Sequence, residues 1–225
     1  MGAVYGDGTV YGDGAVYGDG AVYGDGRNMS DSVWIDELER VGALLRGHFK
    51  LTTGRHSDTF FLLARLTERP WVLARWAQEL ARQVTGVGPV STVVGPAIGG
   101  IIPAYAVAQE MRGVRALFAE KEDGGMAFCR GFALEPGEPV AVVEDVVTTG
   151  FSVGQVMRAV ESAGAVVRAV AALVNRTGEE TVGAVPLLSV VRLEAPSWPA
   201  DACPLCAGDL PLVRPKAARR DPGPR

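Results

Sequence analysis

The chain has 225 residues and a formal net charge of −4, with 48% apolar and 21% charged residues. These values are typical of a globular protein of one or two domains, and they argue against a strongly basic nucleic-acid-binding surface. Three cysteines are too few for a disulfide framework, so we expect a cytoplasmic protein.

The first 28 residues differ in composition from the rest. Residues 3–26 are four copies of a six-residue unit, AVYGDG or TVYGDG. The unit is short for a stacked array and has too little apolar surface to offset its ordering entropy. We expect residues 1–28 to be a disordered leader, with a binding tail as the alternative and Met29 as an alternative translation start. Residues 29–215 are predicted to form one domain, followed by a flexible tail at 216–225.

The domain is predicted to alternate helices and strands. A first helix that Ser32 can cap ends at Gly47. The later elements are strands at 49–51 and 59–63, a helix at 70–84, a strand at 90–94, a helix at 100–111, strands at 114–118 and 139–143, a helix at 152–163 and a strand at 166–174. Residues 120–125 are polar and glycine-rich, which predicts a mobile loop. This alternation predicts an α/β fold with a parallel sheet.

The stretch 83–109 carries no charged residue and could be mistaken for a membrane span. It contains three prolines and five glycines. A bilayer would leave a backbone interrupted so often without hydrogen-bond partners, so we expect no membrane span.

The stretch VAVVEDVVTTGFS, residues 140–152, is the most informative about chemistry. A buried strand leads to Glu144 and Asp145, and a Thr-Thr-Gly turn then opens a helix. Backbone N–H groups at a helix N-terminus, with the hydroxyls of Thr148, Thr149 and Ser152, suit a phosphate. The two acids suit ribose hydroxyls or Mg²⁺. The pattern predicts a ribose 5-phosphate site, and the alternative is an ordinary helix cap.

This stretch resembles the phosphoribosyl pyrophosphate (PRPP) signature of type I phosphoribosyltransferases. The resemblance implies the fold of that family, a parallel sheet flanked by helices with a small hood subdomain made from the N-terminal segment and the tail. It implies that the acids hold the ribose hydroxyls and that the turn holds the 5-phosphate. The implied PRPP-binding residues are Glu144, Asp145, Val146, Val147, Thr148, Thr149, Gly150, Phe151 and Ser152. Phe151 replaces a small residue of the relatives, so its side chain must point out of the turn.

Two further segments resemble orotate phosphoribosyltransferases. HFKLTTGRHSDTFF, residues 48–61, resembles their N-terminal signature, which implies that Phe60 and Phe61 flank the base. Since adjacent strand residues face opposite sides, at least one of the two should face the core. LVNRTG places Arg176 after a strand, where the family has an arginine that contacts orotate, as Thr148 would also do. The alternative for Arg176 is a surface salt bridge.

VVGPAIGGIIPAYAVAQE, residues 93–110, resembles the pyrophosphate loop of the family. The resemblance implies that pyrophosphate lies against Ala97, Ile98 and Gly99. Some relatives place a lysine in this loop and this chain does not.

The segment FAEKEDGGMAFCRGF, residues 118–132, corresponds to the basic catalytic loop of the family. Lys121 is the candidate catalytic residue, with a solvated surface charge as the alternative. Glu120 stands where many relatives have arginine, and Gly124 stands where many have the main catalytic lysine. Met126 stands where many have histidine, and Arg130 is the other nearby cation.

The tail CPLCAGDLPLVRP, residues 203–215, resembles that of a bacterial group of these enzymes. Its Cys203 and Cys206 supply two of the four ligands that zinc needs, and the chain has no second cysteine pair. We therefore predict free structural thiols and no metal site within one chain. The alternatives are a metal shared between the tails of two subunits and a redox pair, and the proline-rich tail disfavours the second. His56 is either near the active site or a surface imidazole.

The resemblance implies an orotate phosphoribosyltransferase of de novo pyrimidine biosynthesis. Such an enzyme converts orotate and PRPP into orotidine 5′-monophosphate and pyrophosphate with Mg²⁺. It implies a cytoplasmic homodimer with no nucleic-acid or membrane partner. The alternatives are a purine-type phosphoribosyltransferase and a PRPP-binding regulator without turnover.

Overall fold

The computed structural model describes residues 30–51, 53–208 and 210–214. It also describes the backbone of two short antiparallel pairs, β1 (Val4–Tyr5) with β2 (Thr9–Val10) and β3 (Val16–Tyr17) with β4 (Ala21–Val22). The rest of the predicted leader (1–28) and the predicted tail (216–225) lie outside the described residues.

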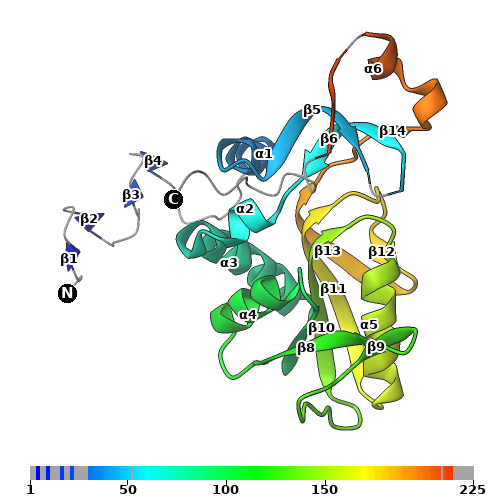
Figure 1. Cartoon of the computed structure of the whole chain (residues 1–225). Helices are drawn as coiled ribbons and strands as arrows, with labels where there is room; N and C mark the ends of the chain where they lie inside the picture. The colour runs from blue at the N-terminus through cyan, green and yellow to red at the C-terminus, as the bar shows by residue number, and fades with distance from the viewer. Residues whose placement is uncertain are drawn as a thin grey trace, which may run out of the picture.

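A seven-stranded sheet forms the centre of the domain (Figure 1). Its order is β12 (Thr181–Val182), β13 (Val185–Arg192), β11 (Val166–Asn175), β10 (Pro139–Val147), β7 (Thr92–Pro96), β8 (Arg115–Glu122) and β9 (Gly125–Ala127). The five strands from β13 to β8 are parallel, and the edge strands β12 and β9 are antiparallel to their neighbours. The continuous apolar runs of β10 and β11 are buried because helices cover both faces of the sheet.

Helices pack on both faces of this sheet, and Figure 1 shows α3 and α4 on one side and α5 on the other. One core cluster joins the sheet to α1 (Asp31–Arg40), α2 (Ala64–Thr67), α3 (Pro70–Val87) and α4 (Ile101–Glu110). A second cluster joins the other face to α5 (Phe151–Ser162). The parallel α/β fold predicted from the sequence is confirmed.

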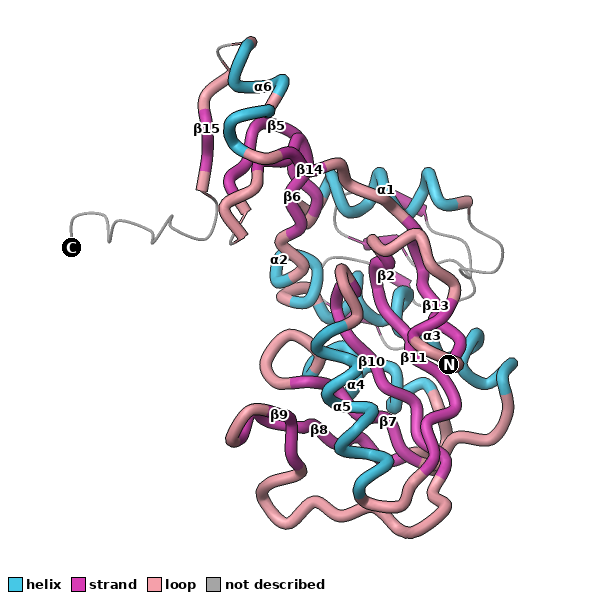
Figure 2. Tube along the Cα trace, turned by 90° about the vertical axis from the view of Figure 1, so that its right-hand side faces the viewer, coloured by secondary structure: helices cyan, strands magenta, loops and turns pink. Residues whose placement is uncertain are grey.

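A smaller four-stranded sheet lies at one end of the molecule (Figure 2). Its order is β14 (Ser197–Trp198), β6 (His56–Phe61), β5 (Leu44–Lys50) and β15 (Leu212–Val213). The 3₁₀ helix η1 (Ala200–Ala202) and the short helix α6 (Pro204–Ala207) connect β14 to β15. This sheet, with η1 and α6, is the hood, and it combines the N-terminal segment and the tail as expected.

The first helix is shorter than predicted. It begins after Ser30 rather than Ser32, and it ends at Arg40 rather than Gly47. Gly42 adopts a left-handed φ of 73°, and the N–H of Ala43 donates to the carbonyl of Leu38 at 2.8 Å. This glycine-terminated turn closes the helix, so the residues that follow enter β5.

The segment predicted as a mobile loop at 120–125 is instead part of a hairpin. β8 continues through Glu122 and pairs with β9, with Lys121 opposite Met126. Asp123 and Gly124 both have positive φ at the tip, as a tight hairpin turn requires. β10 also runs four residues past its predicted end, to Val147.

Within the described part of the chain, no helix combines the length and apolar character needed to cross a membrane. The helix built from the uncharged stretch, α4, has 10 residues.

A buried carboxylate links α1 to α3. Glu37 is only 3% exposed and accepts hydrogen bonds from the guanidinium of Arg75 and from Trp76 Nε1, the latter at 2.8 Å. The Trp34 and Trp76 rings meet edge-on, with centroids 4.9 Å apart. The hydrogen bonds of Glu37 and the contact between the two tryptophan rings hold α1 against the core.

We expect Glu37→Ala to lower the free energy of unfolding by about 3–5 kcal/mol, because it leaves a buried guanidinium and an indole N–H without this acceptor. Urea denaturation measures the change. The matched control is Glu39→Ala, which removes an exposed bond to Arg46 and should cost less than about 1 kcal/mol. Equal losses in the two variants would contradict the role of Glu37.

Candidate active site

Two adjacent acids lie near the carboxyl end of β10. Glu144 is 7% exposed and Asp145 is half-buried. The N–H of Asp145 donates to Glu144 Oε1 at 3.1 Å, and the N–H of Val146 donates to Asp145 Oδ1 at 2.7 Å. Both carboxylates are therefore held by the local backbone beside the turn that follows.

The turn between β10 and α5 forms a hollow of about 200 Å³. Its lining consists of Glu144 and residues 146–153. Thr148 and Thr149 are exposed, and Thr149 Oγ1 accepts a hydrogen bond from the N–H of Phe151 at 3.4 Å. Gly150 has a left-handed φ of 73°, which permits the tight entry into the helix. The segment predicted to hold a 5-phosphate thus has its hydroxyls and a helix N-terminus at one hollow.

The Phe151 side chain is 69% exposed. This agrees with the expectation that a bulky residue at the turn must extend into solvent.

Burial raises the pKa of Glu144 from 4.5 to about 8, and the neighbouring charge of Asp145 adds to the effect. A hydrogen bond from the Ser152 side chain acts in the opposite direction. The two acids therefore share a site that disfavours two negative charges in the absence of a donor or cation.

The predicted pyrophosphate loop lies directly against these acids. It connects β7 to α4, and the N–H of Ala97 donates to the carbonyl of Ala119 at 2.8 Å. A Cβ added to Gly99 would lie 3.0 Å from Asp145 Oδ2, and one added to Gly100 would lie 2.8 Å from the carbonyl oxygen of Val143. Glycine thus allows the loop backbone to approach the end of β10. The peptide between Ala97 and Ile98 is cis, and Ile98 is 86% exposed.

Arg176 follows β11, and its N–H donates to the carbonyl of Val147 at 2.9 Å. Its guanidinium lies over the ring of Phe61, with Cζ 4.9 Å from the ring centroid. Arg176 Nε is buried and has no hydrogen-bond partner, and burial lowers the pKa of the guanidinium. The alternative of a surface salt bridge finds no support, because Arg176 pairs with no carboxylate of the described residues.

The two adjacent phenylalanines face different surroundings, as strand alternation predicts. Phe60 is 7% exposed and packs against Phe49, with ring centroids 5.7 Å apart. Phe61 is half-buried beneath Arg176. An aromatic face beside an arginine with an unpaired N–H suits a planar ring that carries a carboxylate. This geometry favours Phe61 over Phe60 as the base contact.

The cations of the β8–β9 hairpin differ in their partners. Arg130 makes two hydrogen bonds to Glu120, at 2.8 and 3.0 Å, and lowers the pKa of that carboxyl. Lys121 is exposed and makes no salt bridge with another described residue. The tip of the hairpin contacts α5 through Gln155 Nε2 and the carbonyl of Gly124, 3.4 Å apart. Lys121 is thus the cation of this hairpin that remains available to a ligand.

We expect the stability cost of Glu144 to depend on pH. The raised pKa of Glu144 favours the neutral carboxyl in the folded state. The free energy of unfolding of the wild type should therefore fall as the pH rises from about 4.5 toward about 8. Glu144→Gln should therefore be more stable than wild type at pH 8, by roughly 2–4 kcal/mol, with little difference near pH 4.5. Urea denaturation across this range measures it. Exposed Glu161 on α5 gives the control, Glu161→Gln, and a pH-independent effect of Glu144→Gln would contradict the interpretation.

The chain is similar to known phosphoribosyltransferases over most of its length. Residues 66–203 match the family model of the phosphoribosyl transferase domain. An orotate phosphoribosyltransferase of Desulforamulus reducens is 43% identical over 181 residues, which cover 80% of this chain and 94% of the relative.

Solved structures agree with this assignment. The orotate phosphoribosyltransferase of Aeropyrum pernix matches with a TM-score of 0.58 and 30% identity, over 73% of this chain and 94% of that one. The Mycobacterium tuberculosis enzyme in complex with PRPP matches with a TM-score of 0.56 and 25% identity, over 75% of this chain and 94% of that one. The acids, the glycine loop and the arginine at one sheet edge therefore lie in a chain that belongs to the orotate phosphoribosyltransferase family.

Proposed function

We propose that this protein transfers the 5-phosphoribosyl group from PRPP to orotate, giving orotidine 5′-monophosphate and pyrophosphate in de novo pyrimidine biosynthesis. The observation that carries the proposal is the state of Arg176. This residue is half-buried over Phe61, has an unpaired Nε, and lies beside the turn that follows β10. A guanidinium in this state favours a carboxylate-bearing ring. The curated relatives named orotate phosphoribosyltransferase support the same substrate.

The parts of the site bind different groups of the two substrates in this proposal. Glu144 and Asp145 accept hydrogen bonds from the ribose hydroxyls, and residues 148–152 hold the 5-phosphate. The backbone of residues 97–99 lies against the pyrophosphate. Arg176 orients orotate through its carboxylate, with Thr148 as a second contact.

The chemistry needs positioning more than covalent participation. A ring nitrogen of orotate forms a bond to the anomeric carbon of the ribose as the bond to pyrophosphate breaks, through an oxocarbenium-like state. The protein holds the two reactants in line and offsets the charge that develops on the leaving pyrophosphate. Lys121 is the candidate for that second role.

Mg²⁺ fits the donor set of this site. Two neighbouring carboxylates offer the hard oxygen ligands that this ion prefers. When bound, the ion would supply positive charge that offsets the charge developing on the leaving pyrophosphate. Glu144 and Asp145 are the residues that would hold it.

The homodimer and the cytoplasmic location remain part of the proposal, as does the absence of nucleic-acid and membrane partners. The exposed tip of the β8–β9 hairpin, residues 121–124, supports a dimer in which Lys121 reaches the site of the other subunit. The net charge of −4 supports small-molecule substrates over nucleic acid.

The first experiment follows the absorbance of orotate after addition of PRPP and Mg²⁺, for wild type and for Arg176→Ala. We expect wild type to consume orotate and release pyrophosphate. Arg176→Ala should raise the KM for orotate by about 10- to 100-fold, because it removes a charge-assisted hydrogen bond, and it should leave PRPP affinity nearly unchanged. The matched control is Arg168→Ala, since Arg168 is exposed on the same strand.

Three results would contradict the proposal or its details. An unchanged KM for orotate in Arg176→Ala removes that residue from the base site. Consumption of adenine or hypoxanthine but not orotate favours the purine-type enzyme, for which Arg176 has no carboxylate partner. PRPP binding without turnover of any base favours the regulator. This result would agree with the replacement of the family's basic loop residues in the β8–β9 hairpin.

Lys121→Ala should lower kcat by about 10- to 100-fold with a smaller change in the KM for orotate, because the lysine acts on the leaving group. Lys121→Arg keeps the charge and should retain more of kcat. Steady-state kinetics of the two variants measures the difference. A kcat of Lys121→Ala equal to that of wild type would show that Lys121 is a solvated surface charge.

A further inference from the structure

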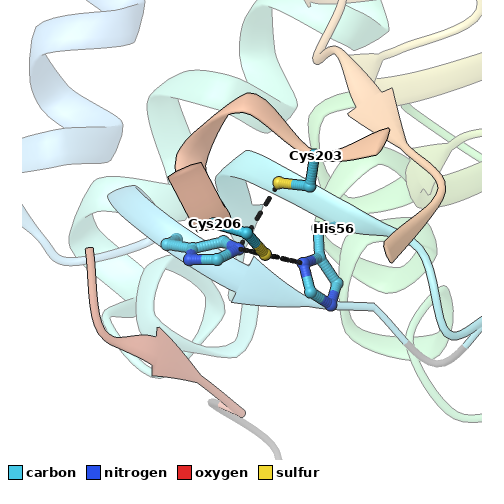
Figure 3. Close-up of side chains that lie close together, drawn as sticks. His56, Cys203 and Cys206 are labelled. Carbon is cyan, nitrogen blue, oxygen red and sulfur yellow. Dashed lines mark hydrogen bonds between the residues drawn. The ribbon is translucent and has the colours of Figure 1, made fainter. Parts of the chain in front are cut away.

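The hood gathers four side chains that the proposed reaction does not use. His48 lies on β5 and His56 lies on β6, while Cys203 precedes α6 and Cys206 lies within it. One ligand atom of each residue lies within 4.8 Å of all the others. Figure 3 shows the side chains of His56, Cys203 and Cys206 converging from the hairpin and from the tail.

Four of the six distances among these atoms are 3.0–3.7 Å, close to the edges of a coordination tetrahedron. His48 Nε2 and His56 Nδ1 are 3.0 Å apart, and Cys206 Sγ lies 3.3 Å from His56 Nδ1. Cys203 Sγ and Cys206 Sγ lie 3.5 and 3.7 Å from His48 Nε2. A tetrahedral zinc ion with Zn–N of about 2.0 Å and Zn–S of about 2.3 Å places its ligand atoms about 3.3–3.8 Å apart.

The surroundings of His48 favour its role as a ligand. His48 Nδ1 lies 2.8 Å from the backbone carbonyl of Leu210, so this nitrogen carries the proton and donates it. The lone pair of Nε2 then faces the cysteines. Metal-bound histidines in proteins almost always donate their second ring nitrogen in this manner.

The chemical state of the cluster also fits a divalent ion. Cys203 and Cys206 are free thiols rather than a disulfide. Two neutral imidazoles and two thiolates would balance the charge of Zn²⁺.

The described tail, residues 200–208 and 210–214, has almost no buried core and joins the hood sheet through the two-residue pairing of β15 with β5. The helices η1 and α6 contain no buried residue, and β15 is a two-residue strand with both residues exposed. Cys203 is 6% exposed and is the one buried apolar residue of the described tail from Ala200 onward. A small unit with so little core commonly depends on a metal or a disulfide.

We propose that His48 Nε2, His56 Nδ1, Cys203 Sγ and Cys206 Sγ bind one Zn²⁺ ion as a structural site that fastens the tail to the hood hairpin. The site is closed, because four protein ligands complete the tetrahedron and leave no position for substrate. It is separate from the hollow between β10 and α5, whose lining includes none of the four residues.

The test begins with the zinc content of the full chain, purified without chelators and loaded with Zn²⁺. We expect about one tightly held Zn²⁺ per chain by elemental analysis. Replacement by Co²⁺ should give the intense visible bands of a tetrahedral ion and a sulfur-to-cobalt charge-transfer band. Since this spectrum is recorded on wild type, it does not depend on the folding of a variant.

Variants then identify the ligands. Cys206→Ser and His56→Ala should each lose most of the tightly bound zinc, and Cys206→Ser should weaken the charge-transfer band. The matched control is Cys129→Ser, because Cys129 lies outside the cluster and should leave zinc content and spectrum unchanged. Removal of the ion from wild type by a chelator should lower the Tm, and Zn²⁺ but not Mg²⁺ should restore it.

Three results would overturn the proposal. They are wild type that holds no zinc after loading, a cobalt spectrum without the sulfur band, and Cys206→Ser with undiminished zinc. None of these readouts measures phosphoribosyl transfer, so the zinc site and the proposed function can fail independently.

Discussion

The parallel pairing of β7, β10 and β11 is the constraint on which the site depends. Val142 of β10 lies beside Val94 of β7, and Val147 lies opposite Asn175 of β11. Strands in this register end at the same edge of the sheet, so the loops that follow them are neighbours whatever their separation in sequence. The glycine loop, the two acids with their turn, and Arg176 meet there for that reason.

The charged side chains at this edge suit a ligand that carries both hydroxyl groups and negatively charged groups. Glu144 and Asp145 are held close together in a place that disfavours two negative charges, and Arg176 is partly desolvated with an unpaired N–H. Under the proposed function, the hydroxyls and phosphates of PRPP and the carboxylate of orotate are the groups that these side chains and the turn would bind.

The sequence was most informative where local chemistry and topology agree. The acids, the Thr-Thr-Gly turn and the glycine loop occupy short continuous segments. Strand alternation predicted that at least one of Phe60 and Phe61 faces the core, but not which of the two. Three local predictions were wrong or incomplete. The left-handed turn at Gly42 ended the first helix before its predicted end at Gly47. The β8–β9 hairpin replaced a predicted loop, and β10 continued through its acids to Val147.

The histidine–cysteine cluster could not be found by spacing alone, because it depends on long-range pairing. A search for a second cysteine pair misses histidines that lie eight residues apart on a hairpin and about 150 residues before the cysteines. Only the pairing of β15 with β5, at Leu212 opposite His48, and of β14 with β6 brings the tail to that hairpin.

This pairing connects the two sites of the molecule. β6 carries His56 at one end and Phe61 at the other, and Phe61 supports the guanidinium of Arg176. The tail pairs with β6 directly, at Trp198 opposite His56. If the hood binds an ion as we propose, that ion restrains the strand that carries Phe61, on which the guanidinium of Arg176 lies. The proposed zinc site would then influence the proposed orotate site through the rigidity of β6, without contact between the ion and the substrate.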